Sequence, residues 1–295
     1  MQAIPVNWIW RRFFLRKGFS FKGIHANTVG ASVKPRSRPI LPEAKRITFE
    51  PAAADGSRDL SSYNSRGRVL YNERQFTIDI HVSADGIAVL QQKLTRIASW
   101  LSGAGELVFD DLPAVIWKAS VFGMLDYAPE KAGKRALLSA VFTAAPFSYA
   151  PFTALSGVPI GSSLQIGSKI PIGLPALLSY QMSASGSIDV INVGTAPTRP
   201  VITINDPYGT YTVEINGVSI EAGIVNSASA DAIIIDCESY SVRGVNSSNS
   251  AIFSGTFPEL APGTNNVLIT NSISWGKEKT ITVDYLPRFL YGWEV

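Results

Sequence analysis

Few residues in this sequence could bind a metal ion. The chain has two histidines, His25 and His81, and one cysteine, Cys237, all far apart along the sequence. Because a zinc site needs several such side chains close together, we expect no structural zinc site. His81 falls on the polar face of a predicted strand, which favours a solvent-facing side chain. A calcium site built from loop oxygens around Asp55 and Asp59 stays open as an alternative.

The sequence also has no pattern typical of an active-site nucleophile. It contains no Gly-x-Ser-x-Gly motif. Cys237 follows an apolar run that starts at Ile233, where a thiol is hard to ionise and is expected to be a buried small side chain. A single cysteine excludes an internal disulfide and suits a reducing cytoplasm or a protein that is indifferent to redox state. Gly103-Ala104-Gly105 follows a predicted helix and so ends it, whereas a phosphate-binding loop opens a helix.

Paired carboxylates are the remaining route to catalysis, because a glycosidase needs two of them at a defined separation. Asp110 and Asp111 are adjacent and precede Leu112-Pro113, a predicted turn. Adjacent carboxylates in such a place usually point apart, and the sequence selects no other pair. We therefore predict no catalytic, cofactor-binding or metal-binding residue, and a protein that is not an enzyme.

Aromatic residues in the second half of the chain suggest another kind of chemistry, the stacking of sugars. Sugar-binding sandwich domains use exposed aromatic faces that are rimmed by polar groups. The candidates are Tyr208, Tyr211, Tyr240 and Trp275. The alternative is that most of them lie in the core or in cross-strand pairs.

The elements that would position these residues are mostly strands. A chain of 295 residues, 46% hydrophobic and 17% charged, is globular and long enough for two domains. Its 18 prolines and 24 glycines break it into short segments, which favours a mainly β fold. One helix is predicted over residues 87–101, with Asp85 as its N-cap and Gly103 and Gly105 as its end. Its apolar stripe consists of Ile87, Leu90, Leu94, Ile97, Ala98 and Leu101.

The first half has its clearest strand pattern at residues 68–82. Phe76, Ile78, Ile80 and Val82 point to one face, and Thr77, Asp79 and His81 point to the other. Further strands are predicted at 46–50, 106–109, 114–122 and 136–144. Together with the single helix, these strands predict an N-terminal β-sandwich-like domain with one flanking helix.

The second half reads as purely β from about residue 185. Strands are predicted at 187–193, 200–205, 210–216, 232–236, 238–243, 266–271 and 279–286, with turns at Asn216-Gly217 and Pro262-Gly263. A spacing of about ten residues between strands suggests a C-terminal β-sandwich. The predicted organisation is an N-terminal extension (1–18), a first domain (19–150), a Gly/Pro-rich linker or arm (151–184) and the second sandwich (185–295).

Positive charge is concentrated at the N-terminal end. Residues 1–46 hold one acidic residue, Glu43, against Arg11, Arg12, Arg16, Lys17, Lys22, Lys34, Arg36, Arg38, Lys45 and Arg46. Such a segment could contact nucleic acid or a membrane surface, or it could pair with acidic neighbours in an assembly. No base-reading motif is present, so we expect no specific nucleic-acid partner. No stretch reaches the ~18 apolar residues of a membrane span, so we expect none.

A series of short motifs runs along the chain. In the N-terminal half these are Phe19-Ser20-Phe21-Lys22-Gly23-Ile24, Pro51 with Asp55-Gly56, the segment Arg68 to Val82, Ile97-Ala98-Ser99-Trp100-Leu101, Glu106 to Asp111, Val115 to Ala119, and Ala140 to Phe147. In the C-terminal half they are Asn192 to Pro200, Ile234 to Glu238, and Phe257 to Asn265. Each motif is short, but their order over residues 19–286 resembles the distal tail protein family of long-tailed bacteriophages, the siphophages.

The resemblance implies a structural virion protein at the tip of the tail, assembled in the host cytoplasm. It implies a first domain that forms a hexameric ring, and a second domain that is galectin-like or similar to a carbohydrate-binding module. The expected partners are further copies of the chain, the tail tube protein, the baseplate hub or tail-associated protein and the tape measure protein. The family brings no catalytic residues, and residues 1–18 precede its usual start. The alternative function is a receptor-binding module that recognises a host cell-wall glycan through the C-terminal sandwich.

Overall fold

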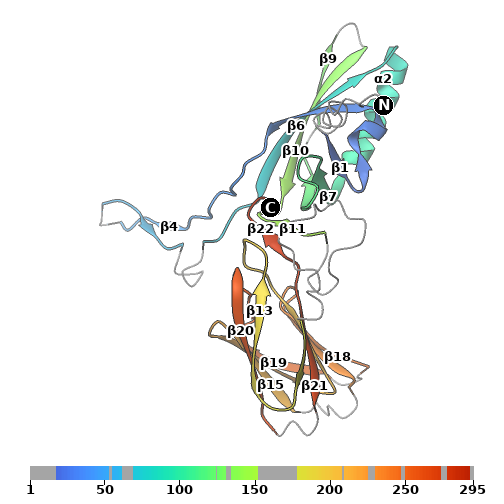
Figure 1. Cartoon of the computed structure of the whole chain (residues 1–295). Helices are drawn as coiled ribbons and strands as arrows, with labels where there is room; N and C mark the ends of the chain where they lie inside the picture. Colours follow the sequence, from blue (N-terminus) through green and yellow to red (C-terminus); the bar gives the residue numbers. More distant parts are fainter. Residues whose placement is uncertain are drawn as a thin grey trace, which may run out of the picture. The chain divides into compact units, whose positions relative to one another are not determined.

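A computed structural model describes most of the chain as two compact units. It describes residues 18–52, 55–61, 69–123, 125–130, 134–151, 178–207, 209–224, 230–246, 250–273 and 278–292. Unit 1 comprises residues 1–148 together with 290–292, and unit 2 comprises residues 149–289 together with 293–295. The described residues are mainly in strands, so the mainly β fold predicted from the sequence is confirmed (Figure 1).

Unit 1 is built on an eight-stranded antiparallel sheet. Its strand order is β2-β1-β7-β8-β10-β6-β3, and β9 pairs with β10 beside this path. The strands are β1 (Phe19–Phe21), β2 (Ile24–His25), β3 (Ala31–Ser37), β6 (Arg74–Ser83), β7 (Gly103–Phe109), β8 (Trp117–Val121), β9 (Asp126–Glu130) and β10 (Arg135–Ala144). A short 3₁₀ helix, η1 (Ala26–Val29), joins β2 to β3. The central pair is β6 and β10, which align over the full ten residues of each strand.

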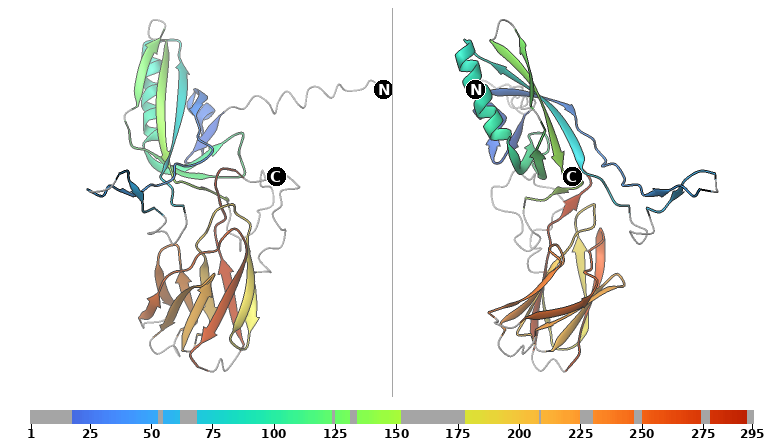
Figure 2. Two further views of the ribbon diagram at one scale, coloured as in Figure 1. Left: turned by 90° about the vertical axis from the view of Figure 1, so that its left-hand side faces the viewer. Right: turned by 180° about the vertical axis from the view of Figure 1, so that it is seen from behind.

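The predicted two-faced pattern of β6 is confirmed. Phe76, Ile78, Ile80 and Val82 are buried, whereas His81 is exposed. The buried face packs against α2 (Ile87–Leu101), which lies along one side of the sheet (Figure 2). Burial of this continuous apolar face supplies most of the stabilisation of such a layer, at roughly 25 cal/mol per Å² of apolar surface.

Aromatic rings fill the space between α2 and the sheet. Phe19 stacks on Trp100 with ring centroids 5.3 Å apart, and Phe21 meets the edge of Phe142 at 5.2 Å. The indole Nε1 of Trp100 donates to the carbonyl of Phe21 at 2.9 Å. The Phe-x-Phe motif at the start of the fold therefore attaches β1 to the helix. The connection from β1 to β2 turns at Lys22 and Gly23, both with positive φ, which is the geometry that a two-residue hairpin requires.

The helix α2 has the bounds predicted from the sequence, but its ends differ from the prediction. Asp85 is not the N-cap: Gly86 is, with extended backbone and no side-chain hydrogen bond to the helix. The helix ends at Leu101, and Gly103 and Gly105 belong to β7. The buried stripe is Leu90, Ile97, Trp100 and Leu101, while Ile87 is exposed. The register of the stripe is set by the contact of Trp100 with β1, which the helix periodicity alone does not reveal.

Replacing Gly86 by aspartate is expected to raise the stability of unit 1 by about 0.5–1 kcal/mol. Gly86 has φ −159°, which any residue adopts, and a Cβ added at this position would meet no atom within 4 Å. The new carboxylate can accept from the free N–H groups of the first helical turn. Gly103→Asp is the contrasting variant, because its φ of +84° is unfavourable for a side chain. Thermal melts should move in opposite directions, and a lower melting temperature for Gly86→Asp would contradict the prediction.

Unit 2 is a sandwich of two five-stranded antiparallel sheets. One has the order β12-β21-β14-β17-β18 and the other the order β13-β20-β15-β16-β19. The strands of the first are β12 (Ser179–Met182), β14 (Val201–Asn205), β17 (Ala232–Asp236), β18 (Ser241–Val245) and β21 (Lys279–Asp284). Those of the second are β13 (Gly186–Asn192), β15 (Thr210–Ile215), β16 (Val218–Ile224), β19 (Ala251–Gly255) and β20 (Gly263–Asn271). Two short strands, β11 (Ser148–Tyr149) and β22 (Arg288–Phe289), pair with each other.

The core of unit 2 is aliphatic, with Ile, Val and Leu from both sheets fully buried. Asn216 and Gly217 both have positive φ and form the turn between β15 and β16, as the dipeptide predicts. Several strands differ from the prediction: β22 was not predicted, and β18 begins at Ser241, three residues after the predicted start of its strand. β12 lies within residues 151–184, which were assigned to the linker, and β16 and β19 were not predicted. Most of that predicted linker, residues 152–177, lies outside the described residues, and so does most of the N-terminal extension.

Candidate functional site

The residues singled out for chemistry in the first half do not form a catalytic group. His25 accepts at Nδ1 from the backbone N–H of Asn27, so its Nε2 carries the proton toward the Asp110 carboxylate, 3.1 Å away. Asp111 binds Arg38 through both oxygens, at 2.7 and 2.6 Å. The hydrogen bond from Arg38 holds the pKa of Asp111 below its usual value. The two adjacent carboxylates therefore serve different partners and cannot act as an acid–base pair.

The loop carboxylates proposed for calcium are likewise separate. Asp59 accepts from the backbone N–H of Ser61 at 2.8 Å, and hydrogen bonding to Ser61 lowers its pKa. Asp55 is exposed at the turn with Gly56. Among the residues that the structure describes, no three His, Cys, Asp or Glu side chains lie close enough to share a metal ion. Within the same residues, no helix is both long and apolar enough to cross a membrane.

Cys237 is fully buried in the core of unit 2, as predicted. Burial raises the pKa of its thiol to about 12, because the thiolate would lose its hydration. We expect no reaction of the folded protein with a thiol reagent near about pH 8, and complete reaction after denaturation. Mass spectrometry of the alkylated protein measures both. Rapid labelling of the folded protein would mean that this part of the sandwich opens to solvent.

A long arm leaves the sheet of unit 1 between β3 and β6 (Figure 1). We define the arm as residues 38–73, of which 53–54 and 62–68 are not described. It is a ribbon held by its own backbone: β4 (Thr48–Phe49) pairs with β5 (Arg58–Asp59), and the N–H of Lys45 donates to the carbonyl of Leu70 at 2.7 Å. Of its described residues only Pro42 is buried. The described part of the arm thus has no hydrophobic core of its own.

The arm nevertheless carries large apolar side chains. Those exposed are Ile40, Leu41, Phe49, Leu60, Val69 and Leu70. Phe49 is 56% and Ile40 is 69% exposed. Exposed apolar side chains concentrated on one segment are typical of interaction surfaces, so the arm is a candidate for one.

Arg74, at the base of the arm, is buried and binds backbone carbonyls from three parts of unit 1. Its guanidinium donates to Pro39 and Ile40 in the arm at 3.1 and 2.8 Å, to Pro146 after β10 at 2.7 Å, and to Leu290 near the C-terminus. Burial lowers its pKa to about 10, which still leaves it charged at neutral pH. One buried cation therefore fixes where the arm begins and where the C-terminal segment returns.

A second candidate surface lies on unit 2. Tyr240 and Phe253 are 52% and 51% exposed, and Phe257 contacts both rings, at centroid distances of 5.6 and 5.4 Å. The guanidinium of Arg199 lies 4.6 Å from the centre of the Tyr240 ring. We call these four residues the Tyr240 patch.

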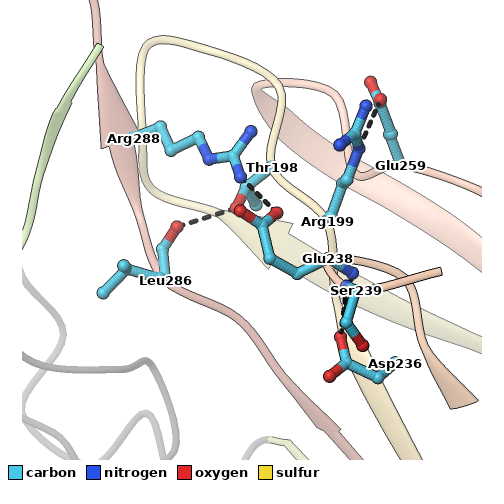
Figure 3. A network of polar contacts seen from close by, with 8 residues as sticks. All are labelled: Thr198, Arg199, Asp236, Glu238, Ser239, Glu259, Leu286 and Arg288. Carbon is cyan, nitrogen blue, oxygen red and sulfur yellow. Dashed lines mark hydrogen bonds and ion pairs between the residues drawn. The ribbon is translucent and has the colours of Figure 1, made fainter. Parts of the chain in front are cut away.

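Figure 3 shows two ion pairs of unit 2, one of which is made by Arg199 of the Tyr240 patch. Arg199 Nε donates to Glu259 at 3.1 Å, and Arg288 binds Glu238. Asp236 closes the turn before Tyr240 by accepting from the N–H groups of Glu238 and Ser239, at 2.9 and 3.0 Å. The patch thus combines exposed rings with donors and acceptors that are held in place.

The four aromatic residues that were candidates for stacking on sugars lie in different environments. Tyr211 is fully buried in the core, so this candidate was wrong. Tyr240 is exposed in the patch. Tyr208 and Trp275 lie outside the described residues. Phe253, Phe257 and Arg199 were not singled out, because they come from segments distant in sequence that only the sandwich brings together.

Comparison with known proteins identifies the kind of domain in unit 1. Residues 31–136 match the family model of the phage tail protein RIFT-related domain. The fold of the chain also resembles that of the Dit protein of phage SPP1, which is described as a paradigm of the hub adsorption apparatus in phages that infect Gram-positive bacteria. The TM-score is 0.59 and the sequence identity is 14%, over 92% of this chain and 98% of the SPP1 protein. A chain of the phage p2 baseplate, in its activated conformation with Sr, gives a TM-score of 0.39 and 8% identity over 91% and 97% of the two chains. No curated protein matches the sequence. The resemblance to siphophage distal tail proteins is thereby confirmed, through a phage tail domain in unit 1 and a fold shared with SPP1 Dit along most of the chain.

Proposed function

We propose that this protein is a structural component of the distal end of a bacteriophage tail, which assembles through unit 1 into a ring, most simply a hexamer. The observation that carries the proposal is the match of residues 31–136 to a phage tail domain. The matched segment includes the whole arm, whose exposed apolar residues support contact with neighbouring subunits. We propose no enzymatic activity and no cofactor.

In this proposal the ring joins the tail tube to the baseplate hub. Its partners are further copies of the chain, the tail tube protein, the hub or tail-associated protein and the tape measure protein. A closed ring uses one interface repeatedly, so each copy presents an arm and a surface that receives one. The protein is then a virion component at the tail tip that assembles in the host cytoplasm. The basic residues 1–18 and the Gly/Pro-rich residues 151–184 would serve this assembly.

The native mass of the full-length protein tests the ring. Light scattering behind size exclusion should give a mass near that of a hexamer of 31.8 kDa chains. Phe49→Asp should release smaller species, because a carboxylate would then be buried at the arm contact. Ile191→Asp in unit 2, at a position 51% exposed, is the matched control and should leave the mass unchanged.

A monomer at every concentration, alone and with the tail tube protein added, would contradict the ring. Equal masses for wild type and Phe49→Asp in an assembled protein would contradict the role of the arm. Circular dichroism of both variants shows whether each is still folded, so that the loss of a subunit contact can be distinguished from unfolding.

We propose as a second function that unit 2 binds a host cell-wall glycan. The observation that favours it is the exposure of Tyr240 and Phe253 on a sandwich of two sheets. Binding of the fluorescently labelled full-length protein to host cells, and its loss after enzymatic removal of wall polysaccharide, tests this function. Unchanged binding to stripped cells would contradict it.

A further inference from the structure

We propose that the Tyr240 patch is a binding site for a neutral saccharide. Tyr240 and Phe253 would stack against the faces of sugar rings, and the flanking arginine and carboxylate groups would bind sugar hydroxyls. This inference deepens the second function proposed above and rests on it, and it is independent of the ring.

The backbone presents Tyr240 outward against its own conformational preference. Tyr240 has φ +54°, a conformation that is uncommon for a bulky side chain. Asp236 stabilises the turn by accepting from two backbone N–H groups, and the hydroxyls of Ser239 and Ser241 lie 2.8 Å apart. A large aromatic ring held at a strained position, and half exposed, fits a recognition residue better than a residue that completes the core.

Neighbouring side chains fix the orientation of the ring before any ligand binds. Arg199 covers one face of Tyr240, and Glu259 holds Arg199 in turn. Phe257 meets Tyr240 at an interplanar angle of 87° and Phe253 at 61°, so one half-buried ring supports two exposed ones. Because these residues are already ordered, a ligand loses little affinity to the ordering of the site.

The patch lies at one edge of the sandwich. β18 and β19 are the last strands of the two sheets. Phe253 on β19 is paired with Ala222 on β16, which is buried, so the Phe253 side chain leans over the core at this edge. Tyr240, in the turn before β18, and Phe253 on β19 both contact Phe257, so the three rings lie together at this edge.

The charges of the patch select a neutral ligand. Arg199 is paired with Glu259 and Arg288 with Glu238, so neither guanidinium is left to attract a phosphate or a carboxylate polymer. The Glu238 side chain is 48% exposed and keeps acceptor capacity for hydroxyl groups. Apolar faces combined with hydroxyls that both donate and accept are the chemistry of a hexose or N-acetylhexosamine unit, which is the ligand class we assign.

Titration of the full-length protein with defined oligosaccharides tests the site. The panel contains neutral oligomers of glucose, galactose, rhamnose and N-acetylglucosamine, with poly(glycerol phosphate) as an anionic probe. Isothermal calorimetry and saturation-transfer NMR should detect at least one neutral oligomer. Tyr240→Ala and Phe253→Ala should each weaken that binding about tenfold or more. Phe122→Ala, which removes an 81% exposed ring from unit 1, is the matched control and should change it less than about twofold.

Several outcomes would overturn the proposal. These are no binding of any neutral oligomer up to about 10 mM, preference for the anionic probe, equal loss in the Phe122 control, or full binding by the Tyr240 and Phe253 variants. Impaired assembly of the Tyr240 variant without any sugar binding would show that the patch contacts protein instead. Native mass measured on the same samples distinguishes the two proposals. A hexamer that binds no sugar would contradict only the saccharide site, and a monomer that binds sugar would contradict only the ring.

Discussion

Replacing Arg74 by methionine is expected to destabilise unit 1 by about 3–5 kcal/mol. Arg74 is 2% exposed and its guanidinium donates to four carbonyls, so its loss leaves a buried site without the donor that these carbonyls share. Methionine fills a similar volume, which keeps the cavity contribution small. Urea denaturation followed by the fluorescence of Trp100 and Trp117, both in unit 1, measures the loss.

Arg58→Met is the matched control for this prediction. Arg58 is an exposed arginine of the arm, and its replacement should change stability by less than about 0.5 kcal/mol. Arg74→Lys should fall between the two, because an ammonium keeps the charge but cannot reach carbonyls on three separate segments. A loss below about 1 kcal/mol for Arg74→Met would mean that water or other donors satisfy those carbonyls.

Replacing Asn265 by leucine is expected to destabilise unit 2 by about 3 kcal/mol. Asn265 is 1% exposed. Its amide donates to the carbonyls of Ala261 and Gly263 at 2.8 Å, and its oxygen accepts from the N–H of Ala261 at 2.8 Å and from Asn216 at 2.8 Å. The Asn265 side chain therefore makes the hydrogen bonds that hold the turn at the start of β20. Leucine, an apolar residue of similar size, can make none of them.

The next residue along the strand provides the control. Asn266 is exposed on the opposite face of β20, and its amide donates to Asp189 at 3.2 Å. Asn266→Leu should cost less than about 0.5 kcal/mol in thermal or chemical denaturation. Similar losses of stability in the two variants would mean that the change in strand propensity from asparagine to leucine causes the effect, and not the loss of the hydrogen bonds in the turn.

The regular elements of this protein were predictable where one face is buried. β6 alternates strictly, and α2 repeats its apolar residues at helical spacing, so both patterns report a single buried face. β19 was missed because four of its five residues are exposed, and an exposed edge strand has no such pattern. β16 follows a correctly predicted hairpin turn, and the turn itself is the signal that should have located it.

The candidate surfaces were less predictable, because they depend on what lies nearby in space. Tyr211 and Tyr240 have similar local sequences, yet one is in the core and the other is in the solvent. The burial of Arg74 depends on carbonyls up to 216 positions away along the chain. Residues 46–51 do include a short strand, but only the structure shows that this strand belongs to an arm whose described residues form no core.

The return of the chain to unit 1 has a consequence for biosynthesis. Unit 1 contains residues 290–292, where the carbonyls of Leu290 and Tyr291 accept from Arg74 and Ser148. A ribosome delivers these residues only after residues 149–289 of unit 2 have been translated, so unit 1 cannot fold to completion in the usual N-terminal-first order. A truncated nascent chain that stops short of Leu290 leaves the base of the arm unsatisfied. Chains that stop before this segment are therefore expected to keep an incompletely folded unit 1.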